Sequence, residues 1–259
     1  MDGAQIIKIE IHKPTQSSQI IMEVSVITPT ANRRHFLPRL IECYESQTYP
    51  KEKMEWIILD DGNESQPLFD SLSKRLPNIR YISLLESRPM GFKLNILCKE
   101  AQGKIIVVMD DDDYYPPTRV SSVIEAFQQN PRKKIAGCSE VYMYNVQTGE
   151  VLVAGPYHNR HALNCTIAFR SSYLYDHSYD NDERCAVESK FTHLFTEPMI
   201  QLPSQQTILH MIHSSNTFKQ KMSINRMQKT NFLLEYFIPH PEIKHYVSEP
   251  SVSSVLVLE

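Results

Sequence analysis

The sequence predicts an α/β fold in which a mostly parallel β-sheet is flanked by helices. Three observations lead to this prediction. Strand-like apolar stretches alternate with helix-like stretches four times between residues 22 and 131. Polar clusters follow three of the strand-like stretches, and open α/β sheets bind ligands at such strand ends. The composition, with 41% hydrophobic and 22% charged residues, is that of an ordinary globular protein.

The strands of the first half are recognised by runs of apolar and β-branched residues. They are expected at 22–30, 55–62, 79–85 and 104–110. A shorter stretch with alternating apolar and polar residues predicts one more strand at 6–11. The polar segment between this strand and the next, which carries proline and serines, is expected to be a loop.

The helices between these strands are recognised by apolar residues at helical spacing. They are expected at 34–47, 67–77, 91–103 and 117–131. Gly103 is expected to close the third helix, because glycine adopts the left-handed conformation that helix C-caps use. Pro117 suits the first turn of the fourth helix, where a missing N–H leaves no hydrogen bond unmade.

The pattern changes after residue 131, where the chain is expected to form a mixed region packed against the first half. Strands are expected at 133–145 and 149–157, and a helix at 182–195. The last 40 or so residues are less patterned and suit a tail, a partner-binding segment or an edge strand. The expected organisation is an N-terminal extension at 1–21, one domain at 22–218, and a C-terminal tail or partner segment at 219–259.

Charge and cysteine content exclude several classes of protein. The net charge of −3 argues against broad nucleic-acid binding, which requires a basic face. Five scattered cysteines without a CxxC pair indicate reduced thiols, not a disulfide framework or a cysteine-ligated zinc site. No stretch reaches the roughly 18 apolar residues that a transmembrane helix needs. A cytoplasmic protein is therefore expected, and attachment to a membrane surface is left open.

The stretch "IIVVMDDDDYYPP" ends a hydrophobic run on four consecutive aspartates, Asp110 to Asp113. Adjacent carboxylates repel one another, so a positive group is expected beside them. Mg²⁺ and Mn²⁺ prefer hard oxygen ligands and often bridge carboxylates to substrate phosphates. Because residues two apart face the same side of an extended backbone, Asp110 and Asp112 can converge on one ligand. The run therefore predicts a site for a metal-bound nucleotide.

Four stretches in order resemble the glycosyltransferase family 2-like group with the GT-A fold. They are "VSVITPTANRRHFLPRLIECYESQTYP", "WIILDDG", "GFKLNILCKEAQGKIIVVMDDDDYYPP" and "AVESKF". The resemblance extends from about Val24 to Phe218. It implies a nucleotide-sugar donor, a divalent cation (Mn²⁺ or Mg²⁺), a glycan or glycoconjugate acceptor hydroxyl, and inversion at the anomeric carbon. UDP is the nucleotide that it implies first, with GDP and dTDP left open.

The resemblance also implies which residues contact the donor. They are Thr28, Pro29 and Thr30 in the nucleotide-binding turn, Asp60 on the uracil edge, Lys93 and Asn95 facing the nucleotide, and Thr166 in the donor-sugar pocket. From the residues alone, Lys93 is equally well explained as a solvated helix residue. Thr166 is equally well explained as the one polar residue of a core strand.

Within the aspartate run, the resemblance identifies Asp110-x-Asp112 as the DxD motif. Asp110 is expected to face the ribose or the donor sugar, with Asp111 beside it, and Asp112 to bind the metal through the diphosphate. A register shifted to Asp111 and Asp113 stays open. His213 is expected to return to the metal from the segment at 206–218, with His210 as the rival histidine.

Transfer to an acceptor hydroxyl requires a general base, which a carboxylate within hydrogen-bond reach provides. By resemblance, Glu188 in "AVESKF" stands at the position of the base. This sequence departs from the family pattern there, because the usual acidic pair is replaced by Val187-Glu188. Asp182 and Glu183 lie just upstream and compete for the role.

Two other functions stay open on the sequence. A nucleotidyltransferase that makes nucleotide sugars would share the α/β sheet and the acidic metal site. Such enzymes usually carry a glycine-rich phosphate loop, and this chain has 7 glycines and no such loop after the strand at 22–30. A degenerate transferase-like module that binds glycans or partners is the other alternative. The retained aspartates and a candidate base argue against the loss of catalysis.

Overall fold

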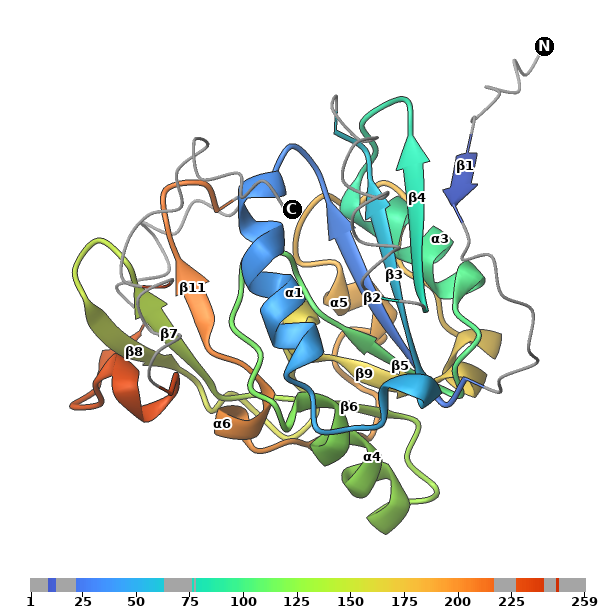
Figure 1. Cartoon of the computed structure of the whole chain (residues 1–259). Helices are drawn as coiled ribbons and strands as arrows, with labels where there is room; N and C mark the ends of the chain where they lie inside the picture. The colour runs from blue at the N-terminus through green and yellow to red at the C-terminus, as the bar shows by residue number, and fades with distance from the viewer. Residues whose placement is uncertain are drawn as a thin grey trace.

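Eight strands form one sheet at the centre of the molecule, in the order β1-β4-β3-β2-β5-β9-β6-β10 (Figure 1). The computed structural model describes residues 9–12, 22–62, 76, 78–216, 227–239 and 246. The four central strands run parallel: β4 (Ile79–Leu84), β3 (Met54–Asp60), β2 (Val24–Thr30) and β5 (Ile105–Val108). The prediction of a mostly parallel central sheet is confirmed.

Four shorter strands extend this sheet at its two edges. They are β1 (Ile9–His12), β9 (Ala168–Arg170), β6 (Ile135–Gly137) and β10 (Met199–Gln201). β1 pairs antiparallel with β4, and β9 lies antiparallel between β5 and β6. A strand from the stretch expected to be an N-terminal extension is thus part of the main sheet.

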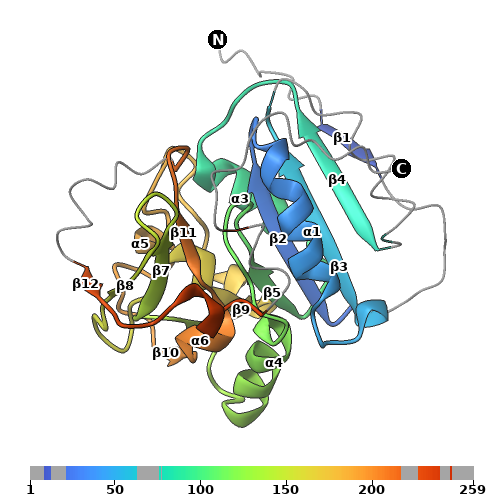
Figure 2. The ribbon, with the colours of Figure 1, turned by 60° about the vertical axis from the view of Figure 1, so that its left-hand side comes forward.

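Helices cover both faces of the sheet because its strands alternate their apolar side chains between the faces. Val26 and Trp56 pack with α1 (Leu37–Glu45) and α4 (Arg119–Gln129) in one cluster. Ile27 and Ile57 pack with α3 (Met90–Glu100) in the other. Figure 2 shows α1 lying across β2 and β3, with α3 behind the sheet.

A second, smaller sheet stands beside the first in the order β11-β7-β8-β12 (Figure 2). Its strands are β11 (His210–Ile212), β7 (Val141–Asn145), β8 (Glu150–Ala154) and β12 (Gln228–Lys229). Residues 227–239 belong to the stretch expected to be a tail, a partner-binding segment or an edge strand, and they contribute the edge strand β12 and a 3-10 turn at Leu234–Tyr236. No helix in the described part of the chain is long and apolar enough to cross a membrane.

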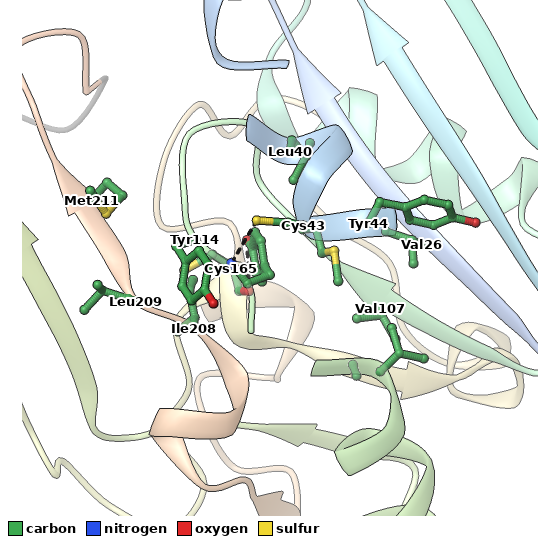
Figure 3. Packing of buried hydrophobic residues seen from close by; sticks show 14 of the residues in the cluster. Val26, Leu40, Cys43, Tyr44, Val107, Tyr114, Cys165, Ile208, Leu209 and Met211 are labelled. Atoms are coloured by element: carbon green, nitrogen blue, oxygen red, sulfur yellow. Dashed lines mark hydrogen bonds between the residues drawn. The ribbon is translucent and has the colours of Figure 1, made fainter. Parts of the chain in front are cut away.

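Apolar side chains between the two sheets fix the loop that follows the aspartate run. Figure 3 shows Cys43 of α1 beside the residues around Tyr114 and Cys165, with Leu209 on the side of β11. Tyr114 and Leu209 pair through their backbones, with N···O distances of 3.1 and 2.9 Å. The loop after β5 is therefore held by the core on one side and by the second sheet on the other.

Several predicted elements differ in their limits. The helix predicted at 182–195 is one short helix, α5 (Glu188–Phe191), because three successive residues with positive φ follow it: His193, Leu194 and Phe195. α3 ends at Glu100 before Gly103, which serves close packing instead: a Cβ there would lie 2.4 Å from the Ser25 nitrogen. The strand predicted at 133–145 is divided into β6 and β7. The helix predicted at 67–77 lies almost entirely outside the described residues.

Candidate active site

A cleft of about 600 Å³ opens where β2 and β5 end. The two strands pair in parallel, so the turn after Ile27 lies beside the loop after Val108. One wall carries Pro29, Thr30 and the aspartates 110–112, and the other carries residues of β7, β8 and the segment 184–188. This is the edge at which ligands of open α/β sheets bind.

Arg33 provides the positive charge expected beside the aspartate run. Its Nη1 lies 2.7 Å from Asp112 Oδ2 and 3.1 Å from Asp111 Oδ1. Asp111 also accepts a 2.6 Å hydrogen bond from the Thr30 hydroxyl. Burial and the neighbouring Asp112 charge raise the pKa of Asp111, against the opposing effect of Arg33. The sequence analysis missed Arg33, although the unmatched charge of the aspartates was the signal for such a residue.

Asp112 is the most densely contacted carboxylate of the run. His213 Nε2 lies 3.2 Å from its Oδ2, and the Asn216 amide lies 3.4 Å from the same oxygen. Burial alone would raise the pKa of Asp112, but the hydrogen bond from His213 and the charge of Arg33 outweigh it and lower the pKa. Asp112 is therefore held as a carboxylate. Asn216 is a further site residue that the sequence analysis did not single out.

Asp110 is held differently from its neighbours. Its backbone N–H donates to the Tyr115 hydroxyl at 2.7 Å, but its Oδ1 is buried and has no hydrogen-bond partner among the described residues. Burial, followed by repulsion from the other three aspartates, raises the pKa of Asp110 well above its ordinary value. Asp110 lines the cleft, and a buried carboxylate oxygen without a partner is a candidate acceptor for a ligand hydroxyl.

Asp113 turns away from the cleft into a separate buried cluster. Its Oδ1 lies 2.8 Å from His210 Nδ1 and accepts the Met211 N–H at 2.9 Å. Burial lowers the pKa of His210, but the Asp113 charge outweighs this and raises it to about 9. Asp113, His210 and Cys165 have the atoms for a metal ion within 4.8 Å of one another. A protonated His210 is nevertheless a poor metal ligand at neutral pH.

The structure places the two histidine candidates differently. His210 lines the cleft but pairs with Asp113, whereas His213 lies under Asp112 with a side chain that is 1% exposed. His213 Nδ1 accepts the Ser215 N–H at 3.2 Å, so its proton lies on Nε2, toward Asp112. The structure thus brings His213, and not His210, to Asp112.

Four of the expected donor contacts do not line the cleft: Thr28, Asp60, Asn95 and Thr166. The Thr28 hydroxyl donates to the Met109 carbonyl, and both Asp60 oxygens accept hydrogen bonds, from the Gly62 N–H and the Tyr81 hydroxyl. These contacts stabilise the strand ends and leave the backbone turn after β2 to face the cleft.

Asn95 and Thr166 support loops beside the cleft. The Asn95 amide donates to the Tyr179 carbonyl and accepts the Tyr179 N–H, both at 2.9 Å. The Thr166 hydroxyl donates to the Leu163 carbonyl at 2.7 Å and accepts the Cys138 N–H at 3.0 Å. Thr166 thereby holds Leu163, which lines the cleft, whereas Asn95 fixes the backbone at Tyr179, which does not.

Lys93 faces the cleft and is paired with a carboxylate. Its Nζ lies 2.9 Å from Asp61 Oδ1, and Asp61 Oδ2 accepts the Arg88 N–H at 2.7 Å. Asp61 is the second aspartate of the "DDG" stretch and was not among the donor contacts expected from the sequence. The pair orients Lys93 at the end of the cleft formed by β2 and α3.

Glu188 is the first residue of α5 and lines the cleft with a residue exposure of 9%. Burial raises the pKa of Glu188 above its ordinary value, against a smaller opposing effect of its own backbone N–H. Asp182 and Glu183 are exposed and do not line the cleft. The structure therefore brings one of the three candidate bases to the aspartates' cleft.

Comparisons with known proteins agree with this arrangement. A family model described as Glycosyl transferase family 2 matches residues 25–174, more than half of the chain. No curated protein sequence gives a match. The structural likenesses below are all under 25% identical and show the fold alone.

Two solved structures illustrate that likeness. A fragment of TarS from S. aureus, in complex with UDP-GlcNAc, is 17% identical with a TM-score of 0.61, over 75% of this chain and 60% of that one. The mannosyltransferase PcManGT from Pyrobaculum calidifontis, in complex with GDP-Man and Mn²⁺, is 16% identical with a TM-score of 0.58, over 79% of this chain and 59% of that one. The chain thus spans about three fifths of the TarS fragment and of the mannosyltransferase. The expected GT-A fold is confirmed.

Proposed function

The chain belongs to glycosyl transferase family 2, and we propose that it transfers a sugar from a nucleotide-sugar donor to an acceptor hydroxyl with inversion. One observation carries the proposal. Three aspartates at the end of β5 and the buried Glu188 line the same cleft, at the ligand-binding edge of the sheet. A metal-bound diphosphate and a general base are the two requirements of this reaction, and both have candidates there.

The donor is proposed to be a UDP-sugar. One protein of similar structure is in complex with UDP-GlcNAc and another with GDP-Man and Mn²⁺. The experiment below therefore also tests which nucleotide, UDP or GDP, this chain binds. The turn at Pro29 and Thr30 and the Lys93–Asp61 pair lie at the end of the cleft where the nucleotide would bind. Asp110, with its unpaired Oδ1, is proposed to accept a hydrogen bond from a ribose or sugar hydroxyl.

The aspartate cluster fits a divalent cation such as Mn²⁺ or Mg²⁺. Its donors are carboxylate oxygens and an imidazole, and the Arg33 guanidinium already lies against two of the carboxylates. Asp112 and His213 are the proposed ligands. His213 would ligate through Nε2 only in its other tautomer, with the proton on Nδ1. A bound cation would neutralise charge that develops on the leaving diphosphate.

Glu188 is proposed to be the general base. As the acceptor oxygen attacks the anomeric carbon, the bond from that carbon to the diphosphate oxygen breaks and the hydroxyl proton passes to the Glu188 carboxylate. Inversion in a single displacement requires no nucleophile from the protein. The burial of Glu188 favours its protonated form and so makes its carboxylate a stronger base. A cytoplasmic location is part of the same proposal.

Calorimetric titration of nucleoside diphosphates and nucleotide sugars, with and without Mn²⁺, tests the proposal. We expect one nucleotide to bind tightly, and only when the metal is present. No binding by the folded protein to any of them would refute it. Donor hydrolysis without acceptor then separates an active transferase from a binding module, because a degenerate site would bind the donor without cleaving it.

A further inference from the structure

Two histidines and a glutamate meet outside the lining of the aspartate cleft: His177, His193 and Glu197. Glu197 Oε1 lies 3.0 Å from His177 Nε2 and 3.1 Å from His193 Nδ1. The three ligand atoms lie within 4.8 Å of one another. The two imidazole rings stack with centroids 4.2 Å apart. None of these residues lines the cleft, so the proposed transfer reaction leaves the cluster unexplained.

The hydrogen bonds of His177 determine which of its nitrogens carries a proton. Its Nδ1 lies 3.1 Å from the Tyr173 carbonyl oxygen, which can only accept, so Nδ1 is protonated. A neutral His177 then has its lone pair on Nε2. The side chain is 9% exposed, and Nε2 is buried. Glu197 Oε1 lies 3.0 Å from Nε2, but the contact does not have the alignment of a hydrogen bond, and Nε2 makes none within the described part of the chain. A buried nitrogen in this state requires a ligand or a second proton.

A metal ion satisfies all three groups at once. Zinc-bound histidines almost always donate their other ring N–H to a carbonyl or a carboxylate, as His177 does to Tyr173. Ligands about 2.0–2.1 Å from a tetrahedral zinc ion lie about 3.3 Å apart. The two nitrogen–oxygen distances of 3.0 and 3.1 Å are close to this value. Two imidazoles and one carboxylate also form a recurring zinc ligand set, with water at the fourth position.

A bound ion would connect two segments of the chain, 173–177 and the turn that follows α5. Tyr173 stacks on His177 at 3.8 Å and donates its hydroxyl to the Phe191 carbonyl, the last residue of α5. His193 and Glu197 lie in the turn that follows α5, where three successive residues have positive φ. Such a turn persists only when its surroundings fix it. An ion at this place ties the 173–177 segment to the turn and so fixes the end of the helix that begins with Glu188.

We propose that His177, His193 and Glu197 form a zinc site with water as the fourth ligand, separate from the aspartate cluster of the cleft. The inference does not depend on the proposed transferase activity, because the site lies outside the cleft. The test measures the binding of Zn²⁺ to the chain without any nucleotide or sugar. The site should take one ion per chain, with a fourth ligand from solvent.

Calorimetric titration of the EDTA-treated, tag-free full chain with Zn²⁺ tests the site. Glu197→Gln and His193→Gln should each weaken binding at least tenfold, because each removes one ligand from an ion held by three. His158→Gln, which changes another exposed histidine, and Asp112→Asn, which changes the cleft, should leave this binding intact. Saturating Zn²⁺ should raise the melting temperature of the wild-type chain by several degrees and that of Glu197→Gln much less.

Two outcomes would overturn the inference. Undiminished zinc affinity in both Glu197→Gln and His193→Gln would show that these residues do not bind the ion and that the cluster is held only by contacts between its own side chains. Loss of the binding in Asp112→Asn would place the ion in the cleft. Substitution of Co²⁺ for Zn²⁺ gives an independent test, because the absorption spectrum of the bound Co²⁺ should show imidazole and carboxylate ligands. A thiolate charge-transfer band would instead assign the ion to a cysteine such as Cys165.

Discussion

Arg33 Nη1 lies 2.7 Å from Asp112 Oδ2 and so occupies the region where the proposed metal would contact that carboxylate. The guanidinium also contacts Asp111 and donates to the Ser215 carbonyl. The chain therefore supplies its own cation to a pair of buried carboxylates that would otherwise repel each other. A divalent ion must compete with this residue for the same oxygens.

Replacing Arg33 should therefore separate the binding of metal from the binding of donor. In Arg33→Met, the affinity for Mn²⁺ without nucleotide should rise about 3–10-fold, because a competing cation worth roughly a kcal/mol is removed. Calorimetric titration with Mn²⁺ measures this change. Arg132→Met, at an exposed arginine, is the control and should leave the affinity unchanged. Weaker Mn²⁺ binding in Arg33→Met would mean that Arg33 supports the ion instead of competing with it.

Removing the charge of Asp112 should weaken metal-dependent nucleotide binding, whereas removing the charge of Asp113 should lower the stability of the fold. Asp112→Asn should reduce metal-dependent nucleotide binding by 100-fold or more, on the order of 3 kcal/mol, with little change in the melting temperature. Asp113→Asn should leave the metal dependence intact and lower the stability, because it removes one partner of a buried pair with His210. Calorimetry and thermal unfolding of both variants test this. The reverse result would favour the shifted register of the DxD motif.

Glu188→Gln should remove catalysis while leaving donor binding nearly unchanged. A positioned general base contributes about 10²–10⁴-fold to the rate, so kcat should fall by that factor and the donor KM by less than about threefold. Steady-state kinetics with the donor identified by titration measures both. Asp182→Asn and Glu183→Gln are the controls, because these residues are exposed and outside the cleft. A large loss of kcat in either control would reassign the base.

The pKa of Glu188 sets the sign of the pH dependence. Burial raises the pKa of Glu188. Because the base must be ionised to accept a proton, the acidic limb of the pH–activity profile should lie at a higher pH than it would for an ordinary glutamate. The same shift has a consequence for stability. A folded-state pKa above the unfolded one favours folding at low pH, and this contribution is lost as the pH rises through the folded value. Urea unfolding should find Glu188→Gln at least as stable as the wild type at mildly alkaline pH, with no gain at acidic pH.

A buried ion pair lies at the amino ends of the central strands, opposite the strand ends that form the cleft. Arg80 Nη2 lies 2.7 Å from Glu55 Oε2, and Glu55 also accepts from the Ser25 hydroxyl and the Gln102 N–H. Arg80→Met leaves the carboxylate buried without its counter-ion and should cost about 3–5 kcal/mol of unfolding free energy. Lys229→Met, in an exposed pair, should cost less than about 1 kcal/mol. Urea unfolding of both variants compares them.

Local sequence patterns are enough to predict the parallel sheet, the helices around it and the strand ends at which the aspartates lie. These features follow from local patterns: apolar runs for buried strands, helical spacing between them, and carboxylates where a strand ends. The apolar residues of β2 and β3 alternate between two clusters, as their order in the chain requires. Asp110 and Asp112 were predicted from residue type and spacing and Glu188 from the family resemblance, and all three line the cleft.

Which polar groups face the cleft depends on how elements far apart in the chain pack together. Thr28 and Thr166 are residue types that often contact ligands, but both are buried by contacts with backbone groups far along the chain: Thr28 donates to the Met109 carbonyl, and Thr166 accepts the Cys138 N–H. His210 and His213 are three residues apart, and the aspartate that each meets depends on how β11 docks against the β5 loop. Arg33 reaches Asp112 across 79 positions of the chain. No local pattern encodes such contacts, because they arise when separate elements pack together.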